Sequence, residues 1–503
     1  MIEIAFRPDR QSDVAITLQL ADHVAALVDA GRLVAGTRLP ATRDVAAAVG
    51  IGRNTVAAAY EILTARGLLN AHVGRGTFVV PRPARAPAAK GTAPTPREFA
   101  WTGLFARGGA PRRMLAALRQ EAASGPVAFD FRGGRVDADS LPAADLRWAF
   151  ARPFHGRTRL RALAAHHDPL GWLPLREQLA RHLAHRGLSC DPAHIAVVSG
   201  IQQAIDLTAR VLVDPGDAIA MEQPGYFGAT LAFAARGAEI LGIDVDHEGL
   251  RTDQLARVLR LRRVKLVYLT PATHCPTGVT LSPARRHALL ALADEYQVPV
   301  FEDDYDNELR YSGPPLPALK TADRAGQVIY AGTFSKILFP GLRVGYVVAA
   351  PTLLRRLVET RVVADFGSGV VEQAALAALL TTRGLERHVR KIRTLYGTRL
   401  TTMLTALRRE MPAGTHWTEP RGGHLVWLTL PPRVAADRLH LAAFDGGITY
   451  SHGEGFYADD RGGNQLALAF TALAPSCIDE GITRLGALLR KHKPSHRSSH
   501  ATH

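Results

Sequence analysis

The larger, C-terminal part of the chain alternates short, continuously apolar runs with longer amphipathic segments. Apolar runs of this kind are typical of strands buried on both faces, and the segments between them, such as 202–212 and 283–296, repeat their apolar residues with a helical period. The alternation predicts an α/β domain with a mostly parallel sheet, whose ligands lie beyond the carboxyl ends of the strands. The predicted strands lie within residues 194–200, 217–223, 264–270, 298–304 and 327–333.

The first eighty residues carry a different pattern. The apolar residues Leu20, Val24, Leu27 and Val28 share one face of a predicted helix within residues 17–34, which Gly31 ends. This segment therefore opens a separate, smaller domain.

Two shorter helices are predicted next, joined by a turn at Gly-Ile-Gly. We expect Thr42 to cap the first, which runs to Val49, and the second to run from about Arg53 to Arg66. Two short helices joined by a glycine-containing turn form a helix-turn-helix unit. A helical dimerisation module is the alternative, because isolated helix-turn-helix patterns are common false positives.

The residues that open the second short helix can reach DNA. Arg53, Asn54 and Thr55 have side chains suited to base edges and phosphates. The following HVGRGTFVV predicts a hairpin with Arg75 between two turn glycines, hence a basic wing tip.

A stretch rich in Pro, Ala and Arg, residues 81–98, separates the two parts and reads as a semi-extended linker. The predicted organisation is a DNA-binding domain over 1–80, a linker over 81–127, a large domain over 128–490 and a basic, disordered tail over 491–503. A chain of 503 residues exceeds what one hydrophobic core supports, which agrees with two domains.

Composition narrows the class of protein only slightly. The formal net charge of +15 favours polyanionic partners, but by itself it supports a nucleic-acid partner only weakly. The three cysteines lie far apart, which argues against a disulfide framework and against a metal site. With no apolar signal core and no long apolar run, we expect a soluble, cytoplasmic protein.

The most informative stretch for chemistry is VIYAGTFSKILFPGLRVGY, residues 328–346. A lone lysine in a turn is usually a solvated surface residue. Here the hydroxyls of Thr333 and Ser335 and the guanidinium of Arg343 suit a phosphate dianion. Lys336 lies where its amine can be desolvated, which lowers its pKa and makes it nucleophilic near neutral pH.

Three other segments could complete such a site. Gly200 precedes a helix predicted to start near Gln202, and the amides at a helix N-terminus suit a phosphate, although an N-cap without ligand is common. Asp303 ends a predicted strand and could hold a pyridine nitrogen protonated, although acidic clusters usually face solvent or cations. Tyr226, after a Pro-Gly turn, could stack on a ring face.

Together these segments resemble fold-type I aminotransferases that depend on pyridoxal 5′-phosphate (PLP), across roughly residues 128–490. The resemblance implies that Lys336 forms the Schiff base with PLP, the internal aldimine. It also implies that Asp303 pairs with the pyridine nitrogen, Tyr305 with the ring hydroxyl, and that Tyr226 stacks on the ring. The residues implied around the phosphate are Gly200, Ile201, Gln202, Thr333, Ser335 and Arg343.

The N-terminal block resembles the winged helix of GntR-type regulators through GTRLPATRDVAAAVGIGRNTVAAAYEILTARGLL and GRGTFV. This resemblance implies DNA contacts from Arg43 and Arg53 and an approach of the wing to the minor groove. The alanines 57–59 leave the middle of the second helix small and uncharged, so we expect base readout to rest on its first turn.

A winged helix, a Pro-rich linker and an aminotransferase-like domain, in that order, resemble MocR-type regulators. The resemblance implies a head-to-tail homodimer in which each DNA-binding domain lies over the large domain of the partner. It also implies that ligand binding at PLP, by a small amine or a B6 vitamer, changes the geometry of DNA binding.

Two departures from the aminotransferase pattern bear on function. The strand QLALAFTAL has Ala467 where aminotransferases place the arginine that clamps the substrate carboxylate, and Cys275 replaces an asparagine beside the ring hydroxyl. The hydroxyl contact is therefore expected from Tyr305, with His274 as a second candidate. We expect a PLP-dependent regulator with weak or no transaminase activity; an active aminotransferase fused to a DNA-binding domain and a purely structural cofactor are the alternatives.

Overall fold

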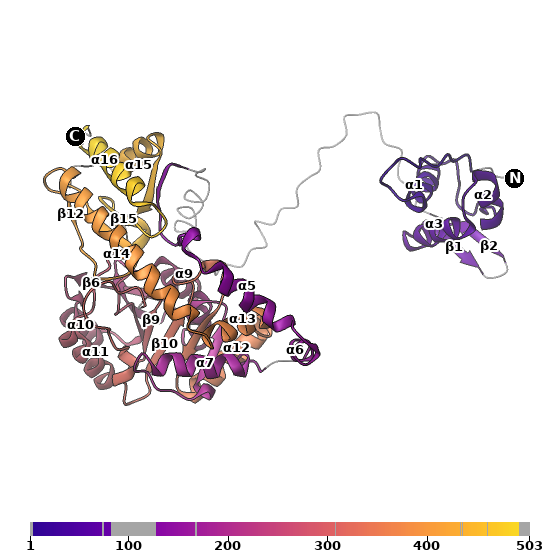
Figure 1. Ribbon diagram of the computed structural model, residues 1–503. Helices are drawn as coiled ribbons and strands as arrows, with labels where there is room; N and C mark the ends of the chain where they lie inside the picture. Colours follow the sequence, from indigo (N-terminus) through magenta and orange to yellow (C-terminus); the bar gives the residue numbers. More distant parts are fainter. Residues whose placement is uncertain are drawn as a thin grey trace, which may run out of the picture. The chain divides into compact units, whose positions relative to one another are not determined.

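The computed structural model describes residues 4–72, 75–81, 127–165, 168–306, 308–432, 434, 436–459 and 461–491. The chain divides into two compact units, residues Met1–Leu104 and Phe105–His503, each of which is described by itself (Figure 1). The predicted linker and the predicted tail, apart from their end residues, lie outside the described residues. Within the described part of the chain, no helix is long and apolar enough to cross a membrane.

Within its described residues, the N-terminal unit contains three α-helices and one antiparallel hairpin. Its core gathers one face of each helix around buried side chains that include Leu20, Val24, Val56 and Leu63. The left-handed backbone of Gly50 makes the predicted turn between the two short helices. The elements are α1 (Ile16–Asp29), α2 (Thr42–Val49), α3 (Arg53–Ala65), β1 (Leu69–His72) and β2 (Gly76–Val79).

The predicted cap by Thr42 is wrong. Ala41 is the N-cap residue of α2, Thr42 is the first helical residue, and no side chain caps this end. The backbone of Ala41 is already extended, and its carbonyl accepts the first helical bonds from the amides of Asp44 and Val45. A hydroxyl can cap only from that extended position, which the alanine occupies.

The large unit is built on an eight-stranded sheet with the order β4-β11-β10-β9-β8-β5-β6-β7. Strands β10, β9, β8, β5 and β6 pair in parallel, whereas β11 is antiparallel to both of its neighbours. The predicted α/β fold is confirmed. The strands are β4 (Ile195–Val198), β5 (Ala218–Gln223), β6 (Glu239–Asp246), β7 (Gly249–Leu250), β8 (Val264–Leu269), β9 (Val300–Asp304), β10 (Val328–Thr333) and β11 (Gly345–Val348).

Helices cover both faces of this sheet (Figure 1). One face packs on α8 (Ile201–Leu212), α9 (Phe227–Ala235) and α12 (Pro351–Asp365). The other face packs on α7 (Leu173–Ala184) and α13 (Val370–Leu380). The remaining helices of this part are α5 (Ala143–Ala151), α6 (Arg157–Leu163), α10 (Thr252–Leu261) and α11 (Pro283–Glu295).

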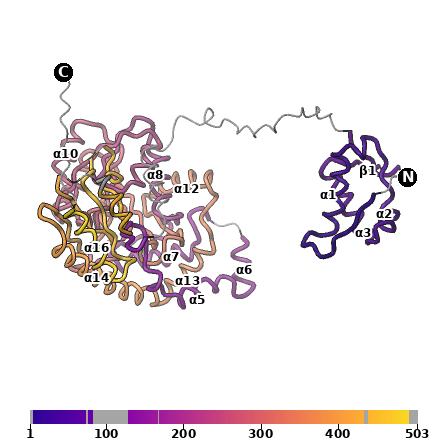
Figure 2. Tube along the Cα trace, turned by 90° about the horizontal axis from the view of Figure 1, so that it is seen from above, coloured from indigo at the N-terminus to yellow at the C-terminus, as the bar shows by residue number. Residues whose placement is uncertain are grey.

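A second, five-stranded sheet has the order β12-β13-β15-β14-β3. Helices α14 (Gly384–Glu410) and α16 (Pro475–Lys491) run side by side (Figure 1; Figure 2) and cover one of its faces. Its other face carries a smaller apolar cluster that includes Cys275 of the large-sheet part. Its elements are β3 (Phe129–Phe131), β12 (His416–Trp417), β13 (Leu425–Thr429), β14 (Ile448–His452), β15 (Gln465–Ala469) and α15 (Ala436–Asp445).

The topology gathers three chemically important segments at one edge of the large sheet. Strands β4, β9 and β10 point the same way, since β11 is antiparallel to both β4 and β10. Their carboxyl ends therefore bring together residues 199–200, 303–305 and 333–336.

Candidate functional site

A cavity of about 360 Å³ lies at this edge, between the two sheets of the large unit. Nine of the ten residues predicted to hold the cofactor line it, and the tenth, Gly200, precedes the lining residue Ile201. The nine are Ile201, Gln202, Tyr226, Asp303, Tyr305, Thr333, Ser335, Lys336 and Arg343.

The carboxylate of Asp303 forms the floor of this cavity and is only 3% exposed. One oxygen, Oδ2, accepts a hydrogen bond of 2.6 Å from the hydroxyl of Tyr268. The other, Oδ1, has no hydrogen-bond partner among the described residues. Burial raises the pKa of Asp303 to about 7, against the opposing effects of Tyr268 and Lys336. An acceptor buried in this way calls for a cationic N–H donor from a ligand.

Lys336 lies in the turn after β10 and points its amine into the same cavity. Burial lowers the pKa of this amine, while the nearby Cys275, Asp306 and Asp303 act in the opposite direction. The neutral, nucleophilic form of Lys336 is therefore easier to reach than that of a lysine in water.

The N-terminus of α8 and two hydroxyls make an anion cradle. Gly200 is the N-cap of this twelve-residue helix, with φ 86°, and a Cβ on it would lie 3.2 Å from a guanidinium nitrogen of Arg343. Arg343 donates to the carbonyl of Ser199 at 2.5 Å, and the hydroxyls of Thr333 and Ser335 lie 2.9 Å apart. Backbone amides, hydroxyls and a guanidinium in one place suit a phosphate dianion.

Two tyrosines form the walls of the cavity. The hydroxyl of Tyr226 donates to the side-chain oxygen of Gln202 at 3.1 Å. The ring of Tyr305 stands edge-on to the imidazole of His424, with centroids 5.6 Å apart. Burial, and then repulsion from Lys336, hold the pKa of His424 well below its usual value, so this imidazole is neutral.

The expected contribution of His274 to the ring-hydroxyl contact is wrong. This residue is buried, its Nδ1 bonds the hydroxyl of Thr277 at 2.6 Å, and its Nε2 lies 3.6 Å from the carboxylate of Glu222. It is not among the residues that line the cavity, whereas the neighbouring Cys275 is. The hydrogen bond to Thr277 keeps the side chain of His274 within this turn and out of the cavity lining.

Several residues of the site were not singled out from the sequence. Tyr268 comes from β8, the neighbour of β9, and only the strand order places it beside Asp303. Six others belong to the five-stranded sheet and the loops around it, and single residues in such loops give no pattern to detect. They are Gly133, Gly134, His424, Leu425, Ser451 and Phe456.

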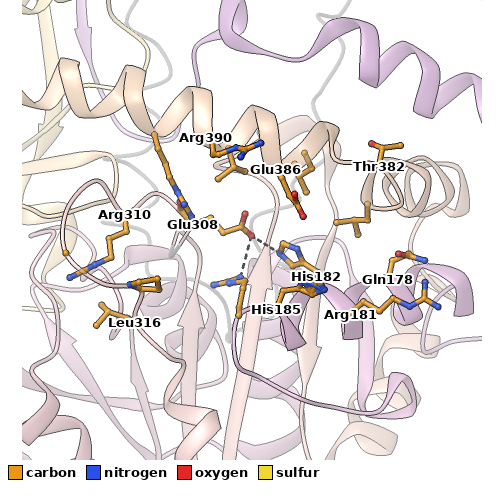
Figure 3. Close-up of a pocket in the computed structure, with 17 residues that line it drawn as sticks. Gln178, Arg181, His182, His185, Glu308, Arg310, Leu316, Thr382, Glu386 and Arg390 are labelled. Carbon is orange, nitrogen blue, oxygen red and sulfur yellow. Dashed lines mark hydrogen bonds and ion pairs between the residues drawn. The ribbon is translucent and has the colours of Figure 1, made fainter.

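Behind the large sheet, a charged network holds the segment that follows β9. The side chain of Asp304 alternates with that of Asp303 and accepts from Arg186 at 2.9 Å. Glu308 accepts from His182 at 3.0 Å and lies 3.5 Å from Arg186 at the wall of a second cavity of about 560 Å³ (Figure 3). The segment that carries Asp303 is thus fixed on both faces of the sheet.

The residues predicted to contact DNA lie at the surface of the N-terminal unit. Arg43, Arg53, Asn54 and Arg75 are exposed, and Thr55 is half-buried. Arg43 forms an ion pair with Asp44, at 3.3 Å, and the arginine side chain remains 81% exposed. Among the alanines 57–59 of α3, Ala59 belongs to the buried core, and residues 57 and 58 are half-buried.

Comparison with known proteins matches both units to families. The model for aminotransferase class I and II matches residues 156–476, and the model for bacterial regulatory proteins of the gntR family matches residues 16–79. The chain is 34% identical to the HTH-type transcriptional regulator TauR of Rhodobacter capsulatus, over 92% of this chain and 93% of that protein. It is 32% identical to the probable rhizopine catabolism regulatory protein MocR of Rhizobium meliloti, over 95% of this chain and 94% of that protein.

Among solved structures, the chain is similar to LysN, an alpha-aminoadipate aminotransferase from Thermus thermophilus that was crystallised with N-(5′-phosphopyridoxyl)-L-leucine. The TM-score is 0.71 at 30% identity, over 78% of this chain and 98% of that chain. The cofactor of this domain is PLP.

The residues around the cavity fit that cofactor. The orphaned Oδ1 of Asp303 suits a protonated pyridine nitrogen, and the cradle at Gly200 and Arg343 suits its phosphate. PLP supplies a carbonyl carbon that condenses reversibly with primary amines. Lys336 is the amine that the cavity itself offers to that carbon.

Replacing Lys336 by Ala should abolish the hydroxylamine-sensitive visible absorbance of the purified protein, because no other amine lines the described part of the cavity. The matched control is Lys391→Ala, which removes an exposed lysine of α14 and should keep the band. A band that persists in the Lys336 variant would show that another residue holds the cofactor.

Glu308→Gln should destabilise the protein near neutral pH and much less in acid. Burial acts to raise the pKa of Glu308, but the hydrogen bond from His182 and the nearby Arg186 and Arg393 outweigh it and lower this pKa to about 2 in the folded protein. Its unfolded pKa is about 4.3, so the stabilisation, on the order of 3 kcal/mol, is complete above that pH and is lost as the pH falls toward 2.

The measurement is denaturant unfolding of both proteins at about pH 7 and about pH 3. The control is Glu386→Gln, which changes an exposed carboxylate on the wall of the same cavity (Figure 3). An equal difference in unfolding free energy at both pH values would contradict the assigned role of the Glu308 charge.

Proposed function

Because this chain belongs to the MocR-type regulators, in which a GntR-family domain precedes an aminotransferase class I and II domain, we propose that a ligand at its PLP site controls promoter binding. The protein is a PLP-dependent DNA-binding regulator. The ligand proposed is a small primary amine or a B6 vitamer. One combination supports this choice: nine of the ten predicted cofactor residues line the cavity, while the resemblance to aminotransferases puts Ala467 of β15 where they have the carboxylate clamp.

The cavity offers a route by which a ligand can change the protein. An amine that reached the cofactor would compete with Lys336 for it, and Asp303 and Asp306 lie close enough to act on the charge of this lysine. Asp306 Oδ2 is 3.4 Å from Nδ1 of His424, a residue that directly precedes β13 of the second sheet. A change in the charge at Lys336 therefore acts on the contact that joins the two sheets.

The contact between Asp306 and His424 could couple ligand binding to the arrangement of the two sheets. A ligand shifts an equilibrium only as far as its affinity differs between two arrangements of the protein. The pair of Asp306 and His424 is buried, so its energy depends strongly on whether the neighbouring lysine is charged. We propose that this pair biases the arrangement of the two sheets.

On the DNA side, we propose that Arg43, Arg53, Asn54, Thr55 and Arg75 bind the operator. Their exposure, and the position of three of them in the first turn of α3, support this assignment. In helix-turn-helix proteins the N-terminal residues of the second helix contact base edges in the major groove.

We also propose a head-to-tail homodimer for the working form of the protein. Large apolar side chains that are 41% to 53% exposed lie on and beside α5 and α6, which supports burial of this surface by another copy. They are Trp148, Phe154 and Leu160.

The decisive experiment compares operator affinity of the full-length protein and of Lys336→Ala, with and without a panel of amines and B6 vitamers. DNA from upstream of its own gene is the probe. At least one compound should change the affinity of the unaltered protein about fivefold or more. The same compound should leave the lysine variant unaffected.

Two results would contradict the proposal. Equal DNA affinity with and without cofactor and every compound would make PLP a structural group only. Steady turnover of amino donors with 2-oxo acids, at about 1 per second or faster, would make the domain an enzyme.

Arg53→Ala should weaken operator binding by about tenfold and reduce the slope of log affinity against log salt by about one, if the contact is to phosphate. Arg66→Ala is the matched control, because Arg66 follows the last residue of the same helix and pairs with Asp22. Equal effects of the two substitutions would refute the placement of α3 on DNA.

A further inference from the structure

Ala467 lies in a row of three residues on one face of the second sheet, of which Ser451 lines the ligand cavity. In the second sheet, Ala467 of β15 is directly opposite Trp427 of β13 and Ser451 of β14. Residues opposite one another on paired strands point to the same face, and Ser451 lines the cavity. A longer side chain at position 467 would therefore extend toward the place where a ligand substituent lies.

Aromatic groups occupy that place. The rings of Trp427 and Phe456 meet edge to face, with centroids 5.5 Å apart and planes at 88°. Ala467, which is fully buried, belongs to the same apolar cluster as Trp427, Leu425 and Cys275. Since Leu425, Cys275 and Phe456 also line the cavity, the apolar cluster is continuous with its wall.

Among the described residues that line the cavity, no basic side chain is left to pair with a carboxylate of the ligand. Lys336 and Arg343 are the lysine and the arginine there, and the cofactor carbonyl and phosphate account for both. The imidazole of His424 is held neutral by burial and by Lys336. The arginines that flank Gly133 and Gly134 in sequence, residues 132 and 135, both pair with Asp130.

We infer that the ligand is a primary amine with an apolar, preferably aromatic, substituent and no carboxylate, and that Ala467, Trp427 and Phe456 determine this specificity. The inference rests on the proposed function and names the chemical class of its ligand. A carboxylate buried against Ala467 would lose water and gain no charged partner, whereas an apolar group would gain contact with two aromatic rings.

The test uses the full-length protein with PLP bound and three amines. 2-Phenylethylamine and phenylalanine differ only by the carboxylate, and ethanolamine lacks both the carboxylate and the ring. Each is titrated while the visible absorbance of the cofactor and the affinity for the upstream DNA are followed. Half-saturation by 2-phenylethylamine should come at a concentration about tenfold or more below that of the other two.

Two variants of Ala467 sharpen the test. Ala467→Arg restores the missing charge and should improve phenylalanine binding by about tenfold or more, because a charge-assisted pair becomes available. Ala467→Leu is the matched control, which enlarges the side chain without charge and should bring no such gain.

A third variant guards against misfolding of the arginine variant at this buried position. Trp427→Ala should weaken 2-phenylethylamine relative to ethanolamine by about tenfold, because it removes one aromatic wall.

The outcomes separate the inference from the function it rests on. Phenylalanine binding as tightly as 2-phenylethylamine in the unaltered protein would overturn the inference and leave amine sensing intact. Ethanolamine binding equally tightly would overturn its apolar part. No response of absorbance or DNA affinity to any amine would overturn the proposed function itself.

Discussion

The large unit is organised around the buried carboxylate of Asp303, of which only one oxygen accepts a hydrogen bond from the described residues of the chain. Asp303 receives one hydrogen bond, from Tyr268 on the neighbouring strand, and its second oxygen faces the cavity without a partner among the described residues. Such an arrangement costs free energy until a donor arrives. A cationic ring nitrogen, or a similar donor, would offset the desolvation cost of this buried acceptor at the end of β9. The neighbouring anion cradle would then fix the position of the ring.

The same strand connects the cofactor to the rest of the unit. On the far face Asp304 and Glu308 hold Arg186, and Glu308 lies at the wall of the second cavity (Figure 3). Toward the second sheet, Asp306 approaches His424. Alternating side chains of one extended segment thus contact the cofactor cavity, the helical layer and the second sheet in turn. Short, buried polar contacts therefore connect the cavity to the helical layer and to the second sheet. Such contacts are what a binding domain needs to transmit a change at its ligand site.

The strands of the large sheet and several cavity residues could be predicted from the sequence, because the strands are continuous apolar runs and polar residues mark their ends. Asp303, Thr333 and Lys336 were found in this way. Tyr268 could not be found, since its role depends on β8 lying beside β9, and strand order has no signature in the chain. The prediction for His274 was wrong for the same kind of reason. Its place next to Cys275 in the sequence suggested a contact with the ring hydroxyl of the cofactor, but its side chain hydrogen-bonds Thr277 instead.

The two halves of the cavity come from two different sheets, and this has a consequence for specificity. The large sheet supplies Lys336, Asp303 and the phosphate cradle, while the second sheet supplies Leu425 and Ser451, and the apolar cluster that contains Ala467 adjoins them. A side chain can therefore change on the second sheet without disturbing the cofactor. Catalysis requires a site matched to a transition state, but sensing requires only that a ligand bind two arrangements unequally. A missing carboxylate clamp would be costly for a transaminase of amino acids, whereas in a sensor it would select another class of amine.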